Sequence, residues 1–373
     1  MKIKIYFDKY LLKLNLVFIT LLITFGIFLV SSATAVESQR LYGDNFHMIK
    51  NHLFTLSIGI VFAFIIKQMD YKKILNISNY LIIIISFTLF ILLTYGDNFW
   101  GSTRWLPIGF VSLQPSEIAK PIILIWVAEH LSRVELDKNN IKTIWRALFM
   151  PGVAMVLIFL QPDYGMAATI AFIVLIQLLF SKVKIIYPII LSLFGLVCGW
   201  YFLSTAGYRE QRLSVWLERI CDPTSANFQV EELLDKCFQL HQSLIAISSG
   251  GLTGLGPGTS RARWGALPSA YSDFISVIIG EEYGFIGYIV FIFILSFTIV
   301  SFFLIAIRQK NEFKRIFIVG LGAWILFQSV LNLGASVYLL PITGIVLPFV
   351  SYGGSAMVSI FIGLGIMHSR SYE

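Results

Sequence analysis

About ten strongly apolar stretches, each close to the length of a membrane-spanning helix, recur along this chain of 373 residues. A helix needs about 20 mostly apolar residues to cross a hydrocarbon layer roughly 30 Å thick. The composition agrees, because 57% of the residues are hydrophobic and only 13% are charged, a balance typical of membrane proteins. We therefore predict an all-α, polytopic integral membrane protein with spans near residues 14–33, 52–67, 77–95, 117–132, 147–161, 165–181, 185–204, 283–307, 316–340 and 349–367.

Basic residues gather on alternate loops between these stretches. Lys and Arg accumulate on the cytoplasmic side of membrane proteins, so we expect both termini to be cytoplasmic. This topology also accounts for the formal net charge of +7, which we do not interpret as a nucleic-acid-binding surface. No small-residue cleavage site follows the first stretch, which we expect to be a retained helix. The basic clusters are Lys2, Lys4, Lys9 and Lys13; Lys67, Lys72 and Lys73; Arg133, Lys138, Lys142 and Arg146; Lys182 and Lys184; Arg308, Lys310, Lys314 and Arg315; and Arg370.

The longest polar segment, residues 205–282, falls on the opposite, extracytoplasmic side. Composition does not shift enough along the chain to mark a soluble domain, so we predict one membrane domain, residues 1–373, with 205–282 as its long outer loop. Cys221 and Cys237 both lie in this loop. They could form a disulfide in an oxidising compartment, and two free thiols are the alternative.

One carboxylate in this segment, Asp273, directly precedes the apolar run Phe274 to Ile279. A charged group held against a hydrophobic wall is costly, so Asp273 is the first candidate functional residue. We find no P-loop, no glycine-rich dinucleotide motif and no nucleophile elbow, and therefore do not expect an ATP-driven pump. The His and Cys spacing does not match a zinc site.

A second polar group lies at the start of the fourth span. Glu117 and Lys120 are three residues apart and share one face of an apolar helix, where ionisable groups usually point into the helix bundle. A purely structural ion pair that locks two helices is the alternative. Arg104 and Trp105, just upstream, could bind a phosphate and stack on a sugar, or serve as ordinary interface anchors.

Two further polar points follow on the same side of the membrane. Asp163 lies in the turn between the fifth and sixth spans, where such a residue more often caps a helix than performs chemistry. The segment Leu340–Met357 contains two prolines, Ser351 and the pair Gly353–Gly354. It should interrupt a helix at membrane depth, which is tolerated where backbone lines a polar cavity, although an ordinary re-entrant turn is the alternative. All four groups can converge on one site.

Together these motifs resemble the SEDS family (shape, elongation, division and sporulation), and the resemblance covers essentially the whole chain. Departures occur at Tyr271–Ser272, where the family commonly has His-Thr, and at Ser248, Ser336 and Tyr338. The matching residues are Arg104, Trp105, Gln114, Pro115, Ser116, Glu117 and Lys120; Pro162, Asp163 and Gly165; Gln242 to Leu244 and Ser249 to Gly251; Leu267, Pro268, Asp273 and Phe274; Gly280, Glu281, Glu282 and Gly284; and the final Ser351 to Ser355.

The resemblance implies a peptidoglycan glycosyltransferase that polymerises lipid II on the outer face of the bacterial cytoplasmic membrane. It implies that the protein needs no organic cofactor. It also implies that the protein acts together with a class B penicillin-binding protein and other membrane proteins of the division machinery. Asp273 would be the base that accepts the proton of the attacking hydroxyl, with Glu117 and Lys120 as the other catalytic groups. The implied substrate-binding residues are Arg104, Trp105, Gln114, Ser116, Asp163, Gln242, Ser243, Ser249, Arg261, Arg263, Ser351, Gly353 and Gly354.

The leaving group of this reaction is a lipid-linked diphosphate, whose developing charge calls for cations. Lys120, Arg104, Arg261 and Arg263 are the candidates, with a divalent Mg²⁺ or Mn²⁺ also possible. The stretch Tyr42–Leu53 favours the division branch of the family over the elongation branch. A lipid II flippase and a non-catalytic scaffold are the rivals from other classes. A transporter should distribute polar residues across the membrane, whereas here they concentrate on the outer side, which favours the enzyme.

Overall fold

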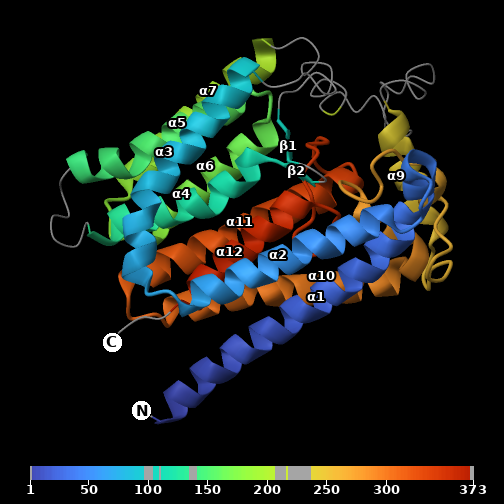
Figure 1. Ribbon diagram of the computed structural model, residues 1–373, viewed down its shortest axis with the longest axis horizontal. Helices are drawn as coiled ribbons and strands as arrows, with labels where there is room; N and C mark the ends of the chain where they lie inside the picture. Colours follow the sequence, from blue (N-terminus) through green and yellow to red (C-terminus); the bar gives the residue numbers. More distant parts are fainter. Residues whose placement is uncertain are drawn as a thin grey trace.

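The computed structural model describes residues 2–95, 104–108, 111–133, 141–205, 216 and 237–369. Nearly all of the described chain is helical, as Figure 1 shows. The elements are α1 (Lys2–Tyr42), α2 (His47–Gln68), α3 (Tyr71–Tyr95), β1 (Leu106–Ile108), β2 (Val111–Leu113), α4 (Pro115–Ser132), α5 (Ile141–Leu160), α6 (Tyr164–Phe180), α7 (Ile186–Thr205), α9 (Phe238–Ser249), the 3₁₀ turn η3 (Ala262–Trp264), α10 (Ile275–Ile307), α11 (Glu312–Ser336) and α12 (Gly354–Met367).

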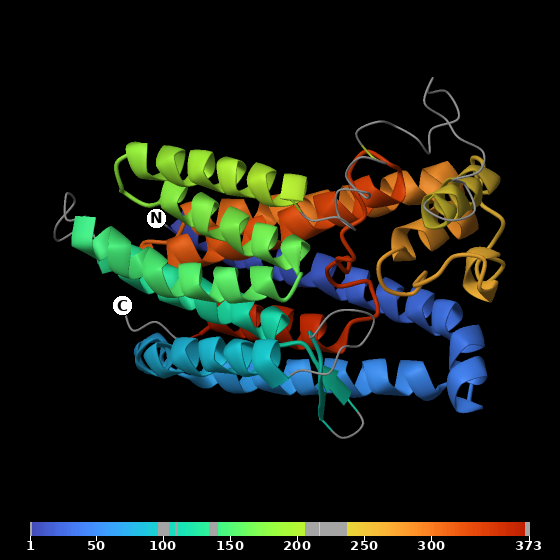
Figure 2. The same cartoon turned by 90° about the horizontal axis from the view of Figure 1, so that it is seen from above.

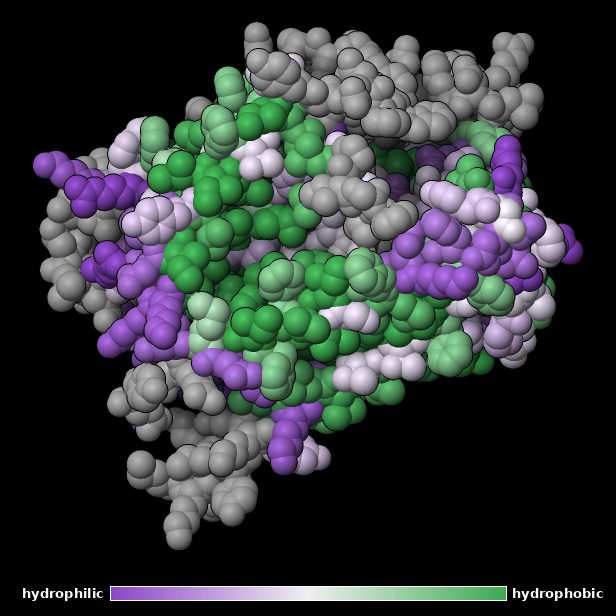
Figure 3. All heavy atoms as spheres, viewed as in Figure 1, coloured by the Kyte–Doolittle hydropathy of each residue, from purple (hydrophilic) through white to green (hydrophobic). Residues whose placement is uncertain are grey.

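The all-α prediction is confirmed, because each expected span coincides largely with one helix. Five helices in the described part of the chain are long and apolar enough to cross a membrane, and three further apolar helices are shorter. Apolar side chains form a broad band across the face seen in Figure 3, with hydrophilic residues at both ends of the band. This distribution suits a bundle surrounded by lipid.

Helix α11 runs through the middle of the bundle. It packs against α10, α6 and α4, while α12 packs against α2 and α4, an arrangement that is visible in Figure 2. The indole of Trp324 in α11 is completely buried. The start of α1 and the end of α12 lie at one end of the bundle, and α9 and η3 lie at the other.

Helix α10 differs most from the sequence prediction. It begins at Ile275 rather than at residue 283, so the long outer loop is shorter than expected and its last residues are helical. The backbone leaves helical geometry at Gly284, where φ is 65°. Residues 250–256 lie alongside this kink and form backbone hydrogen bonds on both sides of it. Glu281 and Glu282 interrupt the apolar run, which explains why the sequence pattern placed the start too late.

Smaller differences occur elsewhere in the outer part of the molecule. The long loop contains α9, which was not predicted, and the chain forms a short antiparallel hairpin in which Leu106 pairs with Leu113. Helix α11 ends at Ser336 and α12 begins at Gly354, so the expected spans 316–340 and 349–367 are each trimmed on this side. The predicted interruption between them is present as an irregular segment, residues 337–353.

Candidate active site

Asp273 lies in a turn immediately before α10 and is half-buried. Its backbone N–H donates to the carbonyl oxygen of Ser269 at 3.2 Å. Its own carbonyl oxygen accepts a hydrogen bond of 2.7 Å from Nδ2 of Asn332 in α11, and the same amide donates to the carbonyl oxygen of Ile345 at 2.8 Å. A methyl group built on Gly344 would lie 3.5 Å from Oδ2 of Asp273. One side chain thus ties the candidate base to the irregular segment 337–353.

The irregular segment is held against the Asp273 turn by further hydrogen bonds. The Ser351 hydroxyl donates to the carbonyl oxygen of Ser272 at 2.6 Å and accepts from the Leu347 N–H at 2.8 Å. The N–H of Tyr352 donates to the carbonyl oxygen of Tyr271 at 3.0 Å. Ser351, which the sequence analysis named as substrate-binding, therefore has a structural role in the described conformation. Nonhelical backbone at this depth is satisfied by protein partners.

Asp163 is the centre of a second polar cluster. It caps α6, since Oδ1 accepts from the Met166 N–H at 3.4 Å. Its Oδ2 accepts from Nε2 of Gln114 at 3.1 Å and from the Ser116 hydroxyl at 3.4 Å. Nη1 of Arg104 lies 3.9 Å from Oδ1. Asp163 is thus both a helix cap and the point on which three other sequence-predicted residues, Arg104, Gln114 and Ser116, converge.

Arg104 reaches this cluster from the segment just before β1. Its Nε donates to the carbonyl oxygen of Gln161 at 3.2 Å, and its Nη2 donates to the carbonyl oxygen of Pro162. The Arg104 side chain remains 28% exposed, and the neighbouring Trp105 is 42% exposed. Arg104 and Trp105 therefore present surface that a ligand can reach, and Gln114 is half-buried.

Glu117 and Lys120 form an ion pair of 2.7 Å between Oε2 and Nζ on the first turns of α4. The Lys120 side chain is fully buried, at 0% exposure, and its Nζ lies 4.5 Å from the ring centroid of Trp324 in α11. The geometry joins α4 to α11, as the structural alternative expects. Because Lys120 has no exposed surface, it cannot touch a substrate in this conformation, and it acts on Asp163 and Glu117 through its charge.

Residues 343–345 of the irregular segment separate the Asp163 cluster from Asp273. A methyl group built on Gly165 would lie 2.8 Å from Cδ1 of Ile345 and 3.4 Å from Cβ of Thr343. The start of α12 joins the same assembly, because the Gln114 N–H donates to the Ser355 hydroxyl at 3.0 Å. Gly354 lies against Thr55 of α2, next to Gly353, the residue before α12. All four polar groups therefore lie at one end of the bundle, with Asp273 and the Asp163 cluster on opposite sides of residues 343–345.

In the long loop, several predicted substrate-binding residues contact other elements of the protein. The Ser243 hydroxyl is buried and donates to the carbonyl oxygen of Ser336 at 2.6 Å, which ties α9 to α11. Gln242 is half-buried and Ser249 is exposed. Nη1 of Arg263 donates to the Ser32 hydroxyl of α1 at 2.9 Å, so its charge is directed toward α1. Ser243 and Arg263 therefore join elements of the fold, and substrate binding by these residues stays a prediction.

Arg261 is exposed, and its backbone N–H donates to Oε1 of Glu281 at 2.9 Å. Oε2 of Glu281 accepts from the Ser260 hydroxyl at 2.5 Å and from the Ala262 N–H at 3.3 Å. The carboxylate of Glu282 accepts from the Ser260 N–H at 3.4 Å. The two buried glutamates therefore fix the loop before Asp273, a role that the sequence analysis did not assign to them.

An aromatic group lies beside Asp273. The rings of Tyr271 and Tyr352 meet edge-on with centroids 5.6 Å apart, and His52 of α2 lies 5.6 Å from Tyr352. Burial raises the pKa of Tyr271, and the carboxylates of Glu37 and Asp273 raise it further. Burial also raises the pKa of Tyr352 to about 12. Both hydroxyls stay protonated at neutral pH and can donate hydrogen bonds next to the candidate base.

His52 and Asn332 were both missed by the sequence analysis. The His52 ring is buried, and neither of its nitrogens has a hydrogen-bond partner among the described residues. The available signal was a polar side chain within an apolar helix, close to its start for His52 and close to its end for Asn332.

The outer loop is described only in part. Cys237 is disulfide-bonded and fully buried, whereas Cys221, its expected partner, lies outside the described residues. Within the described ranges, no three His, Cys, Asp or Glu side chains lie close enough to hold a metal ion.

The fold and the site define a polytopic membrane protein with a carboxylate and an ionic cluster at one end of its bundle. The family model described as cell cycle protein, for FtsW, RodA and SpoVE, matches residues 13–373. This chain therefore belongs to the FtsW/RodA/SpoVE family, which is the SEDS family that its motifs resemble.

Relatives and solved structures agree over nearly the whole length. The chain is 32% identical to the probable peptidoglycan glycosyltransferase FtsW of Wigglesworthia glossinidia brevipalpis, over 100% of this chain and 95% of that protein. It is 33% identical to the stage V sporulation protein E of Bacillus subtilis, over 95% of each. The fold matches the Thermus thermophilus rod shape determining protein RodA with a TM-score of 0.67 at 21% identity, covering 95% of this chain and 94% of that one.

A chain of a peptidoglycan synthase complex, from a study of how polymerisation and crosslinking are coordinated, matches with a TM-score of 0.73 at 21% identity. The match covers 95% of each chain. At this identity the similarity establishes a common fold.

Proposed function

We propose that this protein is a peptidoglycan glycosyltransferase that polymerises lipid II on the outer face of the bacterial cytoplasmic membrane. The observation that carries the proposal is Asp273, a half-buried carboxylate fixed through its backbone to α11 and to residues 343–345. The Asp163 cluster with its partly exposed Arg104 lies on the other side of those residues. Relatives that match nearly the whole chain are named as probable peptidoglycan glycosyltransferases, which supports the same activity.

In the proposed reaction, the acceptor hydroxyl loses its proton to the Asp273 carboxylate as its oxygen attacks the anomeric carbon of the donor sugar. The bond between that carbon and the diphosphate oxygen breaks, and its electron pair leaves with the lipid diphosphate. One glycosidic bond forms and Asp273 ends the step protonated. Arg104 supplies positive charge toward the leaving group, and the buried pair Glu117–Lys120 positions Asp163 and Gln114.

Asp273→Asn tests this assignment. The substitution keeps the size of the side chain but removes its basicity, so polymerisation of lipid II by the purified protein should fall by at least about 100-fold. Asp44→Asn is the matched control, because Asp44 is an exposed carboxylate at the same end of the bundle, paired with Lys50 at 2.9 Å. Glycan chains are measured on a gel. Wild-type polymerisation by Asp273→Asn contradicts the assignment.

Septal wall synthesis in cell division is the role we propose for this activity, with both termini in the cytoplasm. Support comes from the relatives, most of which carry the name FtsW, although the sporulation protein is equally similar. The solved synthase complex supports a class B penicillin-binding protein as the partner. Polymerisation assayed with and without that partner, and with and without Mg²⁺ or Mn²⁺, tests the partner and the cation separately. Depletion in cells distinguishes division from elongation, because filaments indicate a division role and rounded cells an elongation role.

A further inference from the structure

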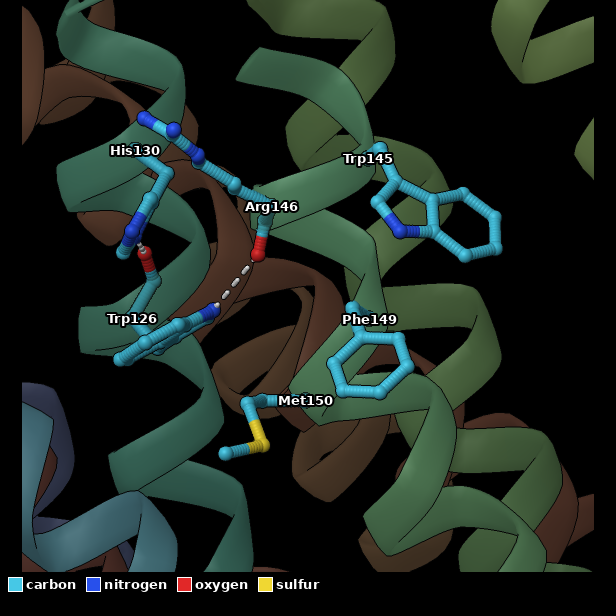
Figure 4. A pocket seen from close by; sticks show the side chains of 6 residues that line it. All are labelled: Trp126, His130, Trp145, Arg146, Phe149 and Met150. Carbon is cyan, nitrogen blue, oxygen red and sulfur yellow. Dashed lines mark hydrogen bonds between the residues drawn. The ribbon is translucent and has the colours of Figure 1, made fainter. Parts of the chain in front are cut away.

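A hollow of about 290 Å³ lies between the C-terminal half of α4 and the N-terminal half of α5 (Figure 4). These halves lie at the end of the bundle opposite the start of α10, which follows Asp273 (Figure 2). Its wall combines large apolar rings with two basic side chains. The lining residues are Trp126, His130, Trp145, Arg146, Phe149 and Met150.

Local contacts hold the hollow open. Nε1 of Trp126 donates to the carbonyl oxygen of Arg146 at 3.3 Å, which fixes the spacing of the two helices. The rings of Trp126 and His130 pack with centroids 4.2 Å apart, and Nδ1 of His130 lies 2.9 Å from the Trp126 carbonyl oxygen. The Arg146 side chain extends toward His130, while Trp145 and Phe149 stand on the other side. Both basic groups therefore flank one edge of the hollow.

The remaining wall faces outward. Trp145 is 66% exposed and Phe149 is also exposed, although both are large and apolar. In a helix bundle surrounded by lipid, such a surface meets acyl chains. Aromatic rings beside an arginine at the end of a spanning helix suit the level of the lipid headgroups.

Among the described residues near the hollow, the exposed charged side chains are basic. Arg146 and Lys142 of α5 are exposed, and Arg133 lies one turn beyond His130. The nearby carboxylate of Glu129 is buried and already paired with Arg133 at 2.5 Å, so it does not offset Arg146. An occupant with a negative headgroup and an apolar tail complements both halves of the wall.

We propose that this hollow binds an anionic phospholipid. Its phosphate lies against Arg146 at the edge shared with His130, and an acyl chain runs along Trp145, Phe149 and Met150. The basic end of the bundle is the end predicted to be cytoplasmic, so the lipid belongs to the inner leaflet. The site is separate from the proposed glycosyltransferase site and does not depend on that activity.

Brominated lipids in nanodiscs test the proposal, because bromine quenches tryptophan fluorescence at contact range. The difference in quenching between wild type and Trp145→Phe isolates the signal of Trp145. At equal mole fraction, brominated phosphatidylglycerol should compete for this position about fivefold better than brominated phosphatidylcholine. Arg146→Gln should remove the preference, and Arg146→Lys should retain most of it.

Lys73→Gln is the matched control, since it removes one exposed positive charge near the start of α3, at the same end of the bundle but outside the hollow. It should leave the preference unchanged. Equal quenching by the two lipids in the wild type overturns the proposal, as does a preference that survives Arg146→Gln. Loss of the preference in Lys73→Gln indicates general electrostatics and also overturns it. Protection of Trp145 from both lipids means that protein covers the hollow, which contradicts the proposal.

Discussion

Lys120 is the single residue whose surroundings constrain its role most. Its ammonium group is balanced by Glu117 at 2.7 Å and lies over the Trp324 ring, with no exposed surface. A cation in this position cannot bind a diphosphate directly, but it can hold the side chains that surround Asp163. The distinction between positioning and structural roles can be measured, because stability and activity need not recover together.

Lys120→Met should cost about 3–5 kcal/mol of stability, since it leaves the Glu117 carboxylate buried without its partner. Polymerisation of lipid II should also be lost. The double variant Lys120→Met with Glu117→Gln should recover most of the thermal stability but not the polymerisation. Recovery of both quantities in the double variant would identify the pair as purely structural.

Tyr352 gives a prediction about alkaline pH. Its folded pKa of about 12 lies above the ordinary value of 10.0 because the ring is buried. A raised pKa means that the folded protein binds this proton more tightly than the unfolded chain, so the contribution to stability is complete below pH 10. It is lost as the pH rises from 10 toward 12. The melting temperature of Tyr352→Phe should therefore fall less steeply over this range than that of the wild type, and parallel curves would contradict the assignment.

At the scale of elements, the kink of α10 depends on close backbone contact with residues 250–256. The N–H groups of Leu255 and Gly256 donate to the carbonyl oxygens of Glu281 and Glu282, each at 3.0 Å. At Gly254, φ is 85°, and a methyl group there would overlap the Glu282 carbonyl group. Both the positive φ of residue 254 and its close contact with the Glu282 carbonyl group therefore require glycine at this position.

Gly254→Ala should lower stability by at least about 3 kcal/mol, because the strained φ and the backbone overlap act together. Gly152→Ala is the control. Gly152 lies inside α5 with nothing within 4 Å of the added methyl group, so its effect should stay within about 1 kcal/mol. Thermal unfolding followed by size-exclusion chromatography measures both variants, and similar melting temperatures would show that the contact can relax.

The elements that were predictable are those that a local pattern encodes. Apolar length located the membrane helices, and the Pro and Gly content of Leu340–Met357 indicated the interruption. The start of α10 was missed because Glu281 and Glu282 look like loop residues until Ser260 and its neighbours are seen to bind them. A local pattern carries no information about partners that lie far away in the sequence.

In the candidate site, too, the local sequence predicted some residues, while the roles of others depend on contacts with distant parts of the chain. Its members Asp163, Gln114 and Ser116 were named from the sequence and do meet. The contact of Arg263 with Ser32 of α1 could not be predicted, because any arginine in an outer loop has the same local sequence pattern. Asn332 was missed for the same reason, since its role depends on two backbone carbonyl groups from different segments.

At the scale of the whole molecule, the two ends of the bundle differ in chemistry. The candidate site, α9 and η3 occupy one end, and the start of α1 and the end of α12 occupy the other. Lys314 near that second end donates to the carbonyl oxygen of Ser369 at 2.6 Å, just after α12. The orientation proposed from the basic loops places this second end in the cytoplasm. The cysteines of the outer loop should then lie on the extracytoplasmic side, which can be tested.

Cys221 and Cys237 should both be extracytoplasmic and bridged, given that Cys237 is disulfide-bonded. In whole cells, a membrane-impermeant maleimide should label them only after reduction. A bridge that closes a loop of about 15 residues contributes roughly 3 kcal/mol in the chain-entropy model, so the melting temperature should fall on reduction. Labelling that requires cell lysis, with or without reductant, would reverse the proposed topology and the outer location of Asp273.

The partners of the buried carboxylates share one further property, which concerns the order in which the chain is made. In the described residues, every buried acidic side chain is matched by groups that precede it or belong to its own helix. Glu117 has Lys120, and Glu129 has Ser78 and Arg133. Asp163 is met by Arg104, Gln114 and Ser116, and Glu281 and Glu282 are met by residues 260–262.

A chain is synthesised and enters the membrane from its N-terminus. Each helix that carries a carboxylate into lipid therefore arrives when its partners have already been made, or brings them with it. None of these charges has to wait, unpaired in hydrocarbon, for a later part of the protein. The acidic helices of the site can thus enter the membrane one at a time during synthesis.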